Sequence, residues 1–201
     1  MENVNLAIVY YSATGTNYQL AKWAEETAKN AGANVRLVKA QELAPDAAID
    51  SNPAWRKNVD ATQHIEEATS EDLDWADAII FSYATRFGGM ASQMKQFLDM
   101  QGGLWAEGKL VNKVVSAMSS AQNDHGGQEA SILSLYTSLM HWGAIIVPPG
   151  YSDPVIFTTG GNPYGTTVTT GEATQERDAK PAVEVQTKRT LDIAARVKAG
   201  N

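Results

Sequence analysis

The chain has 201 residues, 43% of them hydrophobic and 19% charged, and its formal net charge is −7. This is an ordinary globular composition, which argues against disorder, and the acidic charge disfavours binding to nucleic acid. The absence of cysteine excludes a disulfide framework, a thiolate zinc site and a cysteine nucleophile. Because no apolar run approaches the ~20 residues that span a bilayer, and the first residues lack a signal-peptide pattern, we expect a cytoplasmic protein without membrane insertion.

Short apolar runs rich in β-branched residues recur along the chain and predict buried parallel strands. Helical patterns separate these runs; the first helix ends at Gly32 and the last begins at Pro181. The stretches 41–76 and 150–180 are irregular, and we expect extended loops there, the first with short helical pieces. The expected strands are 4–11, 35–39, 78–83, 113–119 and 144–147.

The alternation of strands and helices predicts an α/β protein with parallel strands and helices on both faces. Right-handed crossovers leave few topologies, and five strands favour the three-layer flavodoxin-like fold with strand order 2-1-3-4-5. We expect residues 1–201 to form a single domain of this kind. Its ligand site should lie at the carboxyl ends of strands 1 and 3, where the winding direction reverses.

A small polar loop follows the first strand and leads into a helix. Free N–H groups and the helix dipole at such a position favour a phosphate group. The loop contains no Lys or Arg and matches neither G-x-x-x-x-G-K-[ST] nor G-x-G-x-x-G, which disfavours a triphosphate or Rossmann dinucleotide site. An ordinary capped helix with a polar turn is the alternative interpretation. The candidate phosphate-binding residues are Ser12, Ala13, Thr14, Gly15, Thr16 and Asn17.

Two further polar loops follow the third and fourth strands and should meet the first loop at the same edge. Glycines at 88 and 89 permit close backbone approach to a flat aromatic ligand, although Met90 in a core and Arg86 in a surface ion pair remain alternatives. Backbone N–H groups of the later loop suit the pyrimidine edge of a flavin. The candidates are Thr85, Arg86, Phe87, Ser119, Ser120, Ala121, Gln122, Asn123 and Asp124.

Trp105 and His141 are candidates of a weaker kind. Gly102 and Gly103 are expected to end a helix and leave Trp105 at an exposed turn, where it either packs on the protein or stacks on a flat substrate. His141 lies near a helix C-terminus, where a favourable dipole contact is the usual role. The three histidines are far apart in sequence, so no metal site is expected, and no G-x-S-x-G elbow supports a hydrolase.

Taken together, these motifs resemble the WrbA family of tetrameric, FMN-dependent NAD(P)H:quinone oxidoreductases. The resemblance covers nearly the whole chain and is most specific between Ala78 and Trp105. It is carried by Ala78-Ile79-Ile80-Phe81, Thr85-Arg86-Phe87-Gly88, Gln93-Met94, Phe97-Leu98-Asp99, Gly102-Gly103-Leu104-Trp105, Gly127-Gln128-Glu129 and Asn162-Pro163-Tyr164-Gly165.

The resemblance implies a role for each candidate. Residues 12–17 would hold the FMN phosphate, residues 85–87 would contact the isoalloxazine ring, and residues 119–124 would line its ribityl and pyrimidine side. His141 would contact the flavin site from a neighbouring subunit and supply or relay a proton, and Trp105 would cover the substrate. The chain departs from the family pattern at Thr14, where the family has a Tyr that contacts the nicotinamide.

The implied activity is transfer of two electrons from NADH or NADPH through FMN to a quinone by a ping-pong mechanism, in a homotetramer. Two alternatives stay open. A flavodoxin-type electron carrier would use the acidic surface to dock on redox partners. A flavin-binding partner protein without turnover is the other alternative, since Thr14 replaces the nicotinamide-contacting Tyr.

Overall fold

The computed structural model describes residues 4–170 and 178–200. Its central sheet has the order β2-β1-β3-β5-β6, and all of these strands are parallel. The predicted order 2-1-3-4-5 is therefore confirmed. The strands are β1 (Asn5–Tyr11), β2 (Asn34–Lys39), β3 (Ala78–Arg86), β5 (Val114–Ala121) and β6 (Ile145–Ile146).

Two short strands were not predicted. β4 (Gly89–Met90) turns back antiparallel onto the end of β3, and β7 (Thr167–Thr169) pairs in parallel with the end of β5. The sheet therefore has seven strands. The sequence did not predict these two because elements of two or three residues are too short to show a hydrophobic period. The predicted loop at 84–89 is consequently a β-hairpin.

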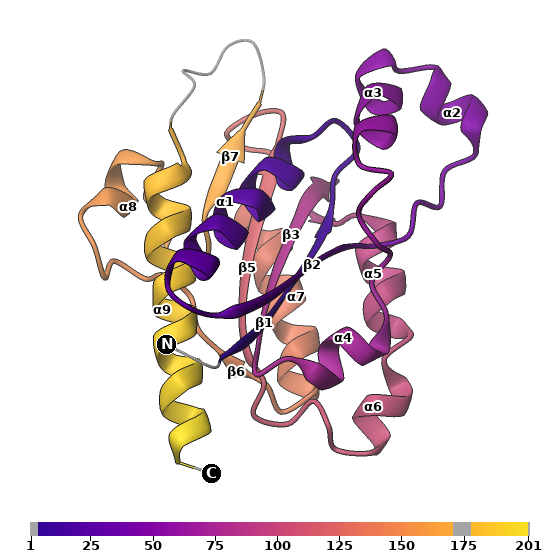
Figure 1. The fold of residues 1–201 in the computed structure, drawn as a ribbon. Helices are drawn as coiled ribbons and strands as arrows, with labels where there is room; N and C mark the ends of the chain where they lie inside the picture. Colours follow the sequence, from indigo (N-terminus) through magenta and orange to yellow (C-terminus); the bar gives the residue numbers. More distant parts are fainter. Residues whose placement is uncertain (1–3, 171–177, 201) are drawn as a thin grey trace.

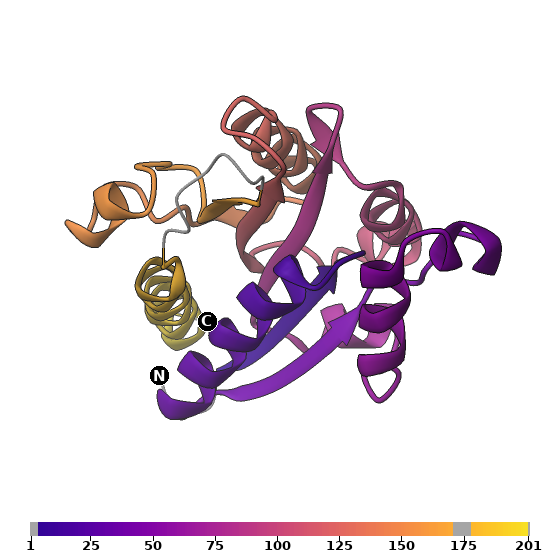
Figure 2. The ribbon, with the colours of Figure 1, turned by 90° about the horizontal axis from the view of Figure 1, so that it is seen from above.

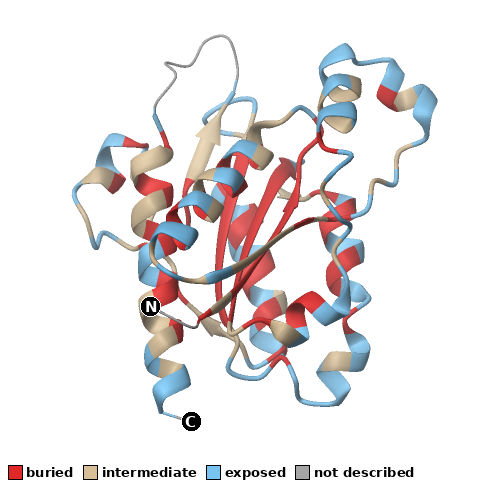
Figure 3. Ribbon diagram, viewed as in Figure 1, coloured by how far each residue is buried: buried red, intermediate tan, exposed pale blue. Residues whose placement is uncertain are grey.

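Helices cover both faces of the sheet (Figures 1 and 2). α1 (Thr16–Asn30) and α9 (Lys180–Ala199) pack on one face, where Leu20, Ala24 and Leu191 join the inward side chains of β1 and β3. α4 (Ser70–Trp75), α5 (Ser92–Asp99) and α7 (Gln128–His141) pack on the other. The central strands are buried almost throughout (Figure 3), as their unbroken apolar runs predict.

The first connecting stretch contains the short helices that the sequence predicts, and the second contains a helix that it does not. The 41–76 stretch includes α2 (Asp46–Asp50) and α3 (Pro53–Ala61), and the 150–170 stretch includes α8 (Val155–Thr158). The rest of the second predicted loop, 171–177, lies outside the described residues. Gly102 and Gly103 do not end a helix but begin a separate one, α6 (Gly102–Ala106). Among the described helices, none is both long and apolar enough to cross a membrane.

Candidate functional site

The loop at residues 12–17 connects β1 to α1 at the carboxyl edge of the sheet. The backbone N–H groups of Gly15 and Asn17 both donate to the Ser12 hydroxyl oxygen, at 3.0 and 3.2 Å. Gly15 has φ = +101°, a conformation that side chains rarely adopt, and this lets the chain curl around that oxygen. A loop whose N–H groups converge on one oxygen at a helix N-terminus fits a phosphate without any Lys or Arg.

Asn17 contributes to this loop differently from the prediction. Its side chain is 1% exposed and does not face the loop's outer surface. With its amide in the orientation that satisfies both ends, it donates to the carbonyl of Tyr83 at 3.1 Å and accepts from the N–H of Ala84 at 3.1 Å and the hydroxyl of Ser120 at 2.8 Å. The Asn17 side chain thus bonds within the protein, and its backbone N–H donates to the Ser12 hydroxyl, so both groups of Asn17 help to shape the loop.

The hairpin of β3 and β4 stands beside this loop. The buried hydroxyl of Thr85 lies 2.8 Å from that of Ser119, which itself donates to the carbonyl of Tyr83 at 2.8 Å. Phe87 at the hairpin tip has φ = +50° and a fully exposed ring. An exposed aromatic residue in a strained backbone conformation, which costs on the order of 1 kcal/mol, is typical of a contact with a ligand or another chain.

The loop at residues 121–127 packs directly against the hairpin. A Cβ placed on Gly127 would stand 2.7 Å from the Cα of Gly88, so the two backbones meet where neither has a side chain. Ser119 and Ser120 are buried within β5, whereas Gln122, Asn123 and Asp124 are exposed beyond its end. The structure thus brings the three predicted loops together at one edge.

Trp105 and His141 lie at the opposite edge of the sheet. The indole N–H of Trp105 donates to the carbonyl of His141 at 3.0 Å, and the Trp105 side chain is 57% exposed. His141 ends α7 just before β6, which pairs with the first residues of β5 (Figure 1). These two residues therefore contact each other and lie away from the three loops of their own chain.

Two residues that the sequence did not single out bond to the loop at residues 12–17 or to the strand residue just before it. Asn58 of α3 donates to the carbonyl of Ser12 at 2.8 Å, and Glu42 accepts from Tyr11, which directly precedes the loop. Both belong to a stretch with no local pattern, so no sequence signal identified them. Within the described ranges 4–170 and 178–200, no group of His, Asp and Glu side chains could hold a metal ion.

The order of the parallel sheet and the helices on both its faces define a protein of the flavodoxin-like α/β class. The structure of a flavodoxin, WrbA-like protein from Agrobacterium tumefaciens superposes with a TM-score of 0.64 at 20% identity and covers 99% of this chain and 100% of that one. The apo structure of an NADH:FMN oxidoreductase, EMOB, gives a TM-score of 0.62 at 14% identity and covers 94% and 90% of the two chains. These similarities concern the fold alone.

Sequence comparison places the chain more narrowly. Residues 6–153 match the family described as NADPH-dependent FMN reductase, and the chain belongs to this family. An NAD(P)H dehydrogenase (quinone) of Deinococcus radiodurans is 51% identical over 96% of this chain and 97% of its own length. A relative with the same description from Brucella abortus is 39% identical over 96% and 98%.

Proposed function

We propose that the protein is an FMN-dependent NAD(P)H:quinone oxidoreductase of the WrbA type. One observation carries this proposal: three segments meet at one edge of the sheet. They are the uncharged loop at residues 12–17, the hairpin with the exposed Phe87 at its tip, and the loop at residues 121–127. The descriptions of the relatives as NAD(P)H dehydrogenases (quinone) support the choice of substrates.

Each loop then has a task in holding the cofactor. Backbone N–H groups of residues 12–17 bind the phosphate, residues 85–87 line the ring, and residues 119–124 present donors to the ribityl chain and pyrimidine edge. When bound, FMN supplies the two-electron redox chemistry that no side chain here can provide. Donors fixed before the reaction stabilise negative charge without reorganisation, which is the contribution expected of the protein.

The net reaction takes a hydride from NADH or NADPH and a proton from solvent, and it converts a quinone to a hydroquinone. Both substrates need the same exposed face next to Phe87, so one must leave before the other binds. We therefore expect ping-pong kinetics, seen as parallel lines in double-reciprocal plots. Intersecting lines would contradict the single shared pocket.

The active assembly in this proposal is a homotetramer in which Trp105 and His141 complete the site of a neighbouring copy. Both are exposed and lie at the wrong edge to reach the loops of their own chain. Their surroundings on α7 include the exposed apolar side chains of Leu133 and Met140, which suit an interface between copies. In that position His141 would supply or relay the proton, since an imidazole ring can both donate and accept one.

The first test is reduction of the FMN-loaded protein under nitrogen. Rapid loss of the oxidised-flavin absorbance on adding NADH or NADPH, restored by benzoquinone, is the expected result. Flavin that binds but is not reduced by either dinucleotide would contradict the enzyme and favour the electron carrier, with Thr14 as the first residue to change to Tyr.

A second test addresses His141. We expect His141→Ala to lower quinone turnover about 100-fold if the imidazole acts as a general acid, while FMN reduction by NADH persists. His64→Ala, a change at an exposed histidine on the β2–β3 connection, is the matched control. Unchanged quinone turnover in His141→Ala would remove the proton-donor role, and light scattering of the same variant shows whether the tetramer persists.

A further inference from the structure

The segment between β2 and α4 carries α2 and α3 to the outer side of the loop at residues 12–17. Asn58 of α3 lies against this loop at Ser12 and near Gly15. Its side-chain N–H donates to the carbonyl of Ser12 at 2.8 Å, and its side-chain oxygen lies 3.4 Å from the position that a Cβ on Gly15 would occupy. The contact therefore spans the turn that curls around the Ser12 hydroxyl.

The contact at Ser12 determines the direction of a neighbouring donor. In a trans peptide the C=O and the following N–H point in opposite directions. Because Asn58 fixes the Ser12 carbonyl toward α3, the N–H of Ala13 is held on the side of the loop away from α3. Gly15 and Asn17 already direct their N–H groups to the Ser12 hydroxyl inside the loop.

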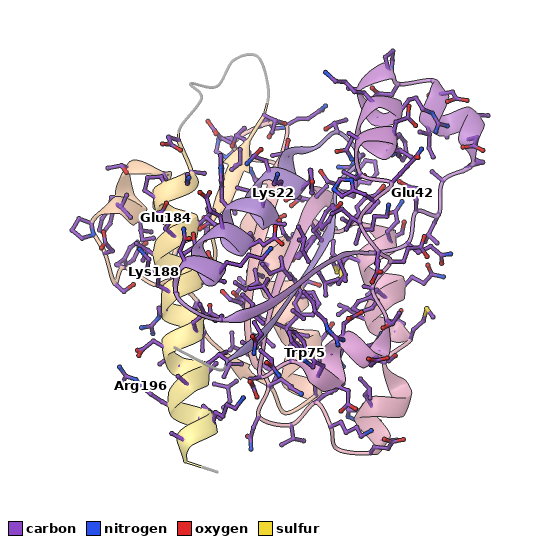
Figure 4. All side chains as sticks on the ribbon, viewed as in Figure 1. Lys22, Glu42, Trp75, Glu184, Lys188 and Arg196 are labelled. Carbon is purple, nitrogen blue, oxygen red and sulfur yellow. The ribbon has the colours of Figure 1, made fainter. Side chains whose placement is uncertain are left out.

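Glu42 holds α3 in place. Its carboxylate accepts from the Trp55 indole of α3 at 3.1 Å, from the Gln93 amide of α5 at 2.7 Å and from the Tyr11 hydroxyl at 3.2 Å. Figure 4 shows Glu42 between α3 and α5. Burial, and next the negative charge of Glu42, raise the pKa of the Tyr11 phenol, so Tyr11 stays a neutral donor.

The α2–α3 pair is also fixed internally. Arg56 of α3 donates to Asp46 at 2.9 Å and Asp50 at 2.6 Å, both on α2. Hydrogen bonds to Asp46 and Asp50 raise the pKa of this exposed guanidinium. The Asn52 side chain caps the start of α3 by accepting from the N–H of Ala54 at 3.0 Å. Asn58 thus projects from a helix that is already ordered before any ligand binds.

We propose that Asn58 is a positioning residue that sets the residue 12–17 loop in its phosphate-binding shape. This inference rests on the proposed function, in which that loop holds the FMN phosphate. A loop already in its binding shape loses little conformational entropy when the ligand arrives, so affinity is higher. We expect the effect at the phosphate end of the ligand, because the hydrogen bond of the Asn58 side chain runs to Ser12 and not to the two loops proposed to surround the ring.

The test compares FMN with riboflavin, which has the same ring and no phosphate. Dissociation constants for both come from quenching of flavin fluorescence in the wild-type protein and in Asn58→Ala. We expect Asn58→Ala to weaken FMN binding about tenfold and to leave riboflavin binding unchanged. Asn58→Asp keeps the shape but removes the donor, and it should weaken FMN binding at least as much. Asn30→Ala, at the exposed end of α1, is the matched control and should change neither constant.

Two outcomes would overturn the proposal: wild-type affinity for FMN in Asn58→Ala, or equal weakening of FMN and riboflavin, which indicates general loosening. Circular dichroism of each variant shows whether it folds. If Asn58→Ala does not fold, the dissociation constants of Asn58→Asp are compared with those of the wild-type protein. A wild-type protein that binds neither flavin would overturn the proposed function itself, and this inference with it.

Discussion

Two inserted segments leave the sheet, and they are attached to it in different ways. Residues 40–69, between β2 and α4, are held by half-exposed polar side chains, chiefly Glu42, Arg56 and Asn58. Residues 147–166, between β6 and β7, are attached to the sheet by the buried side chain of Gln186, which bonds to both Thr166 and Ala117. Water can replace lost partners in the first segment but not in the second, so equivalent substitutions should differ in cost.

Gln186 of α9 is 1% exposed and uses both ends of its amide. It accepts from the N–H and the hydroxyl of Thr166, at 2.7 and 2.8 Å, and donates to the hydroxyl of Ser116 and the carbonyl of Ala117, each at 2.7 Å. The segment's return to the sheet is thereby fixed just before β7, which in turn pairs with residues 119–121 of the candidate site.

The largest effect is expected from Gln186→Ala. It leaves several buried polar groups without partners and creates a cavity, which should lower the free energy of unfolding by about 4 kcal/mol. Urea denaturation measures this value, with the exposed neighbour Lys188→Ala as control. A loss below about 1 kcal/mol would mean that water enters the space left by the Gln186 side chain. The second segment would then be no more sensitive to lost hydrogen bonds than the first.

Gly165→Ala should have the next largest effect. A Cβ at this position would stand 2.1 Å from the carbonyl oxygen of Ala117, a backbone atom that cannot move aside alone. We expect a loss of about 3 kcal/mol in the free energy of unfolding. Gly102→Ala in α6, where no atom lies within 4 Å, should cost nothing or stabilise slightly. Similar losses of unfolding free energy in Gly165→Ala and Gly102→Ala would show that residues 147–166 can shift over β5 to make room for the added methyl group.

The first segment should respond less. Glu42→Ala removes the common acceptor of the half-exposed Trp55 and of the buried Gln93 and Tyr11. Because Glu42 is itself half-exposed, water can enter the space that its carboxylate leaves. The expected loss is about 1–2 kcal/mol in urea denaturation. Glu66→Ala, at an exposed position in the same segment, is the control and should stay within about 0.5 kcal/mol of the wild type. If Glu42→Ala lowered the free energy of unfolding as much as Gln186→Ala, the first segment would not be the less sensitive of the two.

Alkaline pH provides the mildest test, because each segment is bound by a tyrosine. Tyr11 donates to Glu42, and Tyr136 donates to the carbonyl of Tyr164 at 2.7 Å. Burial is the main cause that raises the pKa of both phenols above the ordinary value of 10.0. Their contribution is fully present below pH 10 and is lost as the pH rises above it, because the unfolded chain ionises first.

Each tyrosine then contributes a slope of up to about 1.4 kcal/mol per pH unit above pH 10. We expect Tyr11→Phe and Tyr136→Phe each to flatten the pH dependence of urea denaturation in that range. An unaltered slope in both buried-site variants would contradict the assignment of raised pKa values.

The sequence predicted the order of the sheet and the edge at which the three candidate loops meet, because long apolar runs and strand-to-helix loops have local signatures. It could not predict that Asn17 turns inward, since an outward donor and an inward bridge have the same local sequence. Asn58, Glu42 and Gln186 were missed because their partners lie 46, 51 and 70 positions away along the chain. Such contacts depend on tertiary packing, which no local pattern encodes.

The strand pairing along the outer edge of β5 is interrupted, and this bears on where the chain tolerates an insertion. β6 pairs with Val114 and Val115, and β7 pairs with residues 119–121, which leaves a gap between the two strands. Within it, the N–H of Ala117 donates to the Tyr136 hydroxyl at 3.2 Å, and its carbonyl accepts from Gln186. Side chains thus complete the ladder at Ala117, and of the chain that loops out between β6 and β7 only its ends, at Val147 and Thr166, share backbone hydrogen bonds with β5. A foreign domain or reporter peptide inserted at the exposed turn around Gly160 would therefore leave the sheet and its register intact.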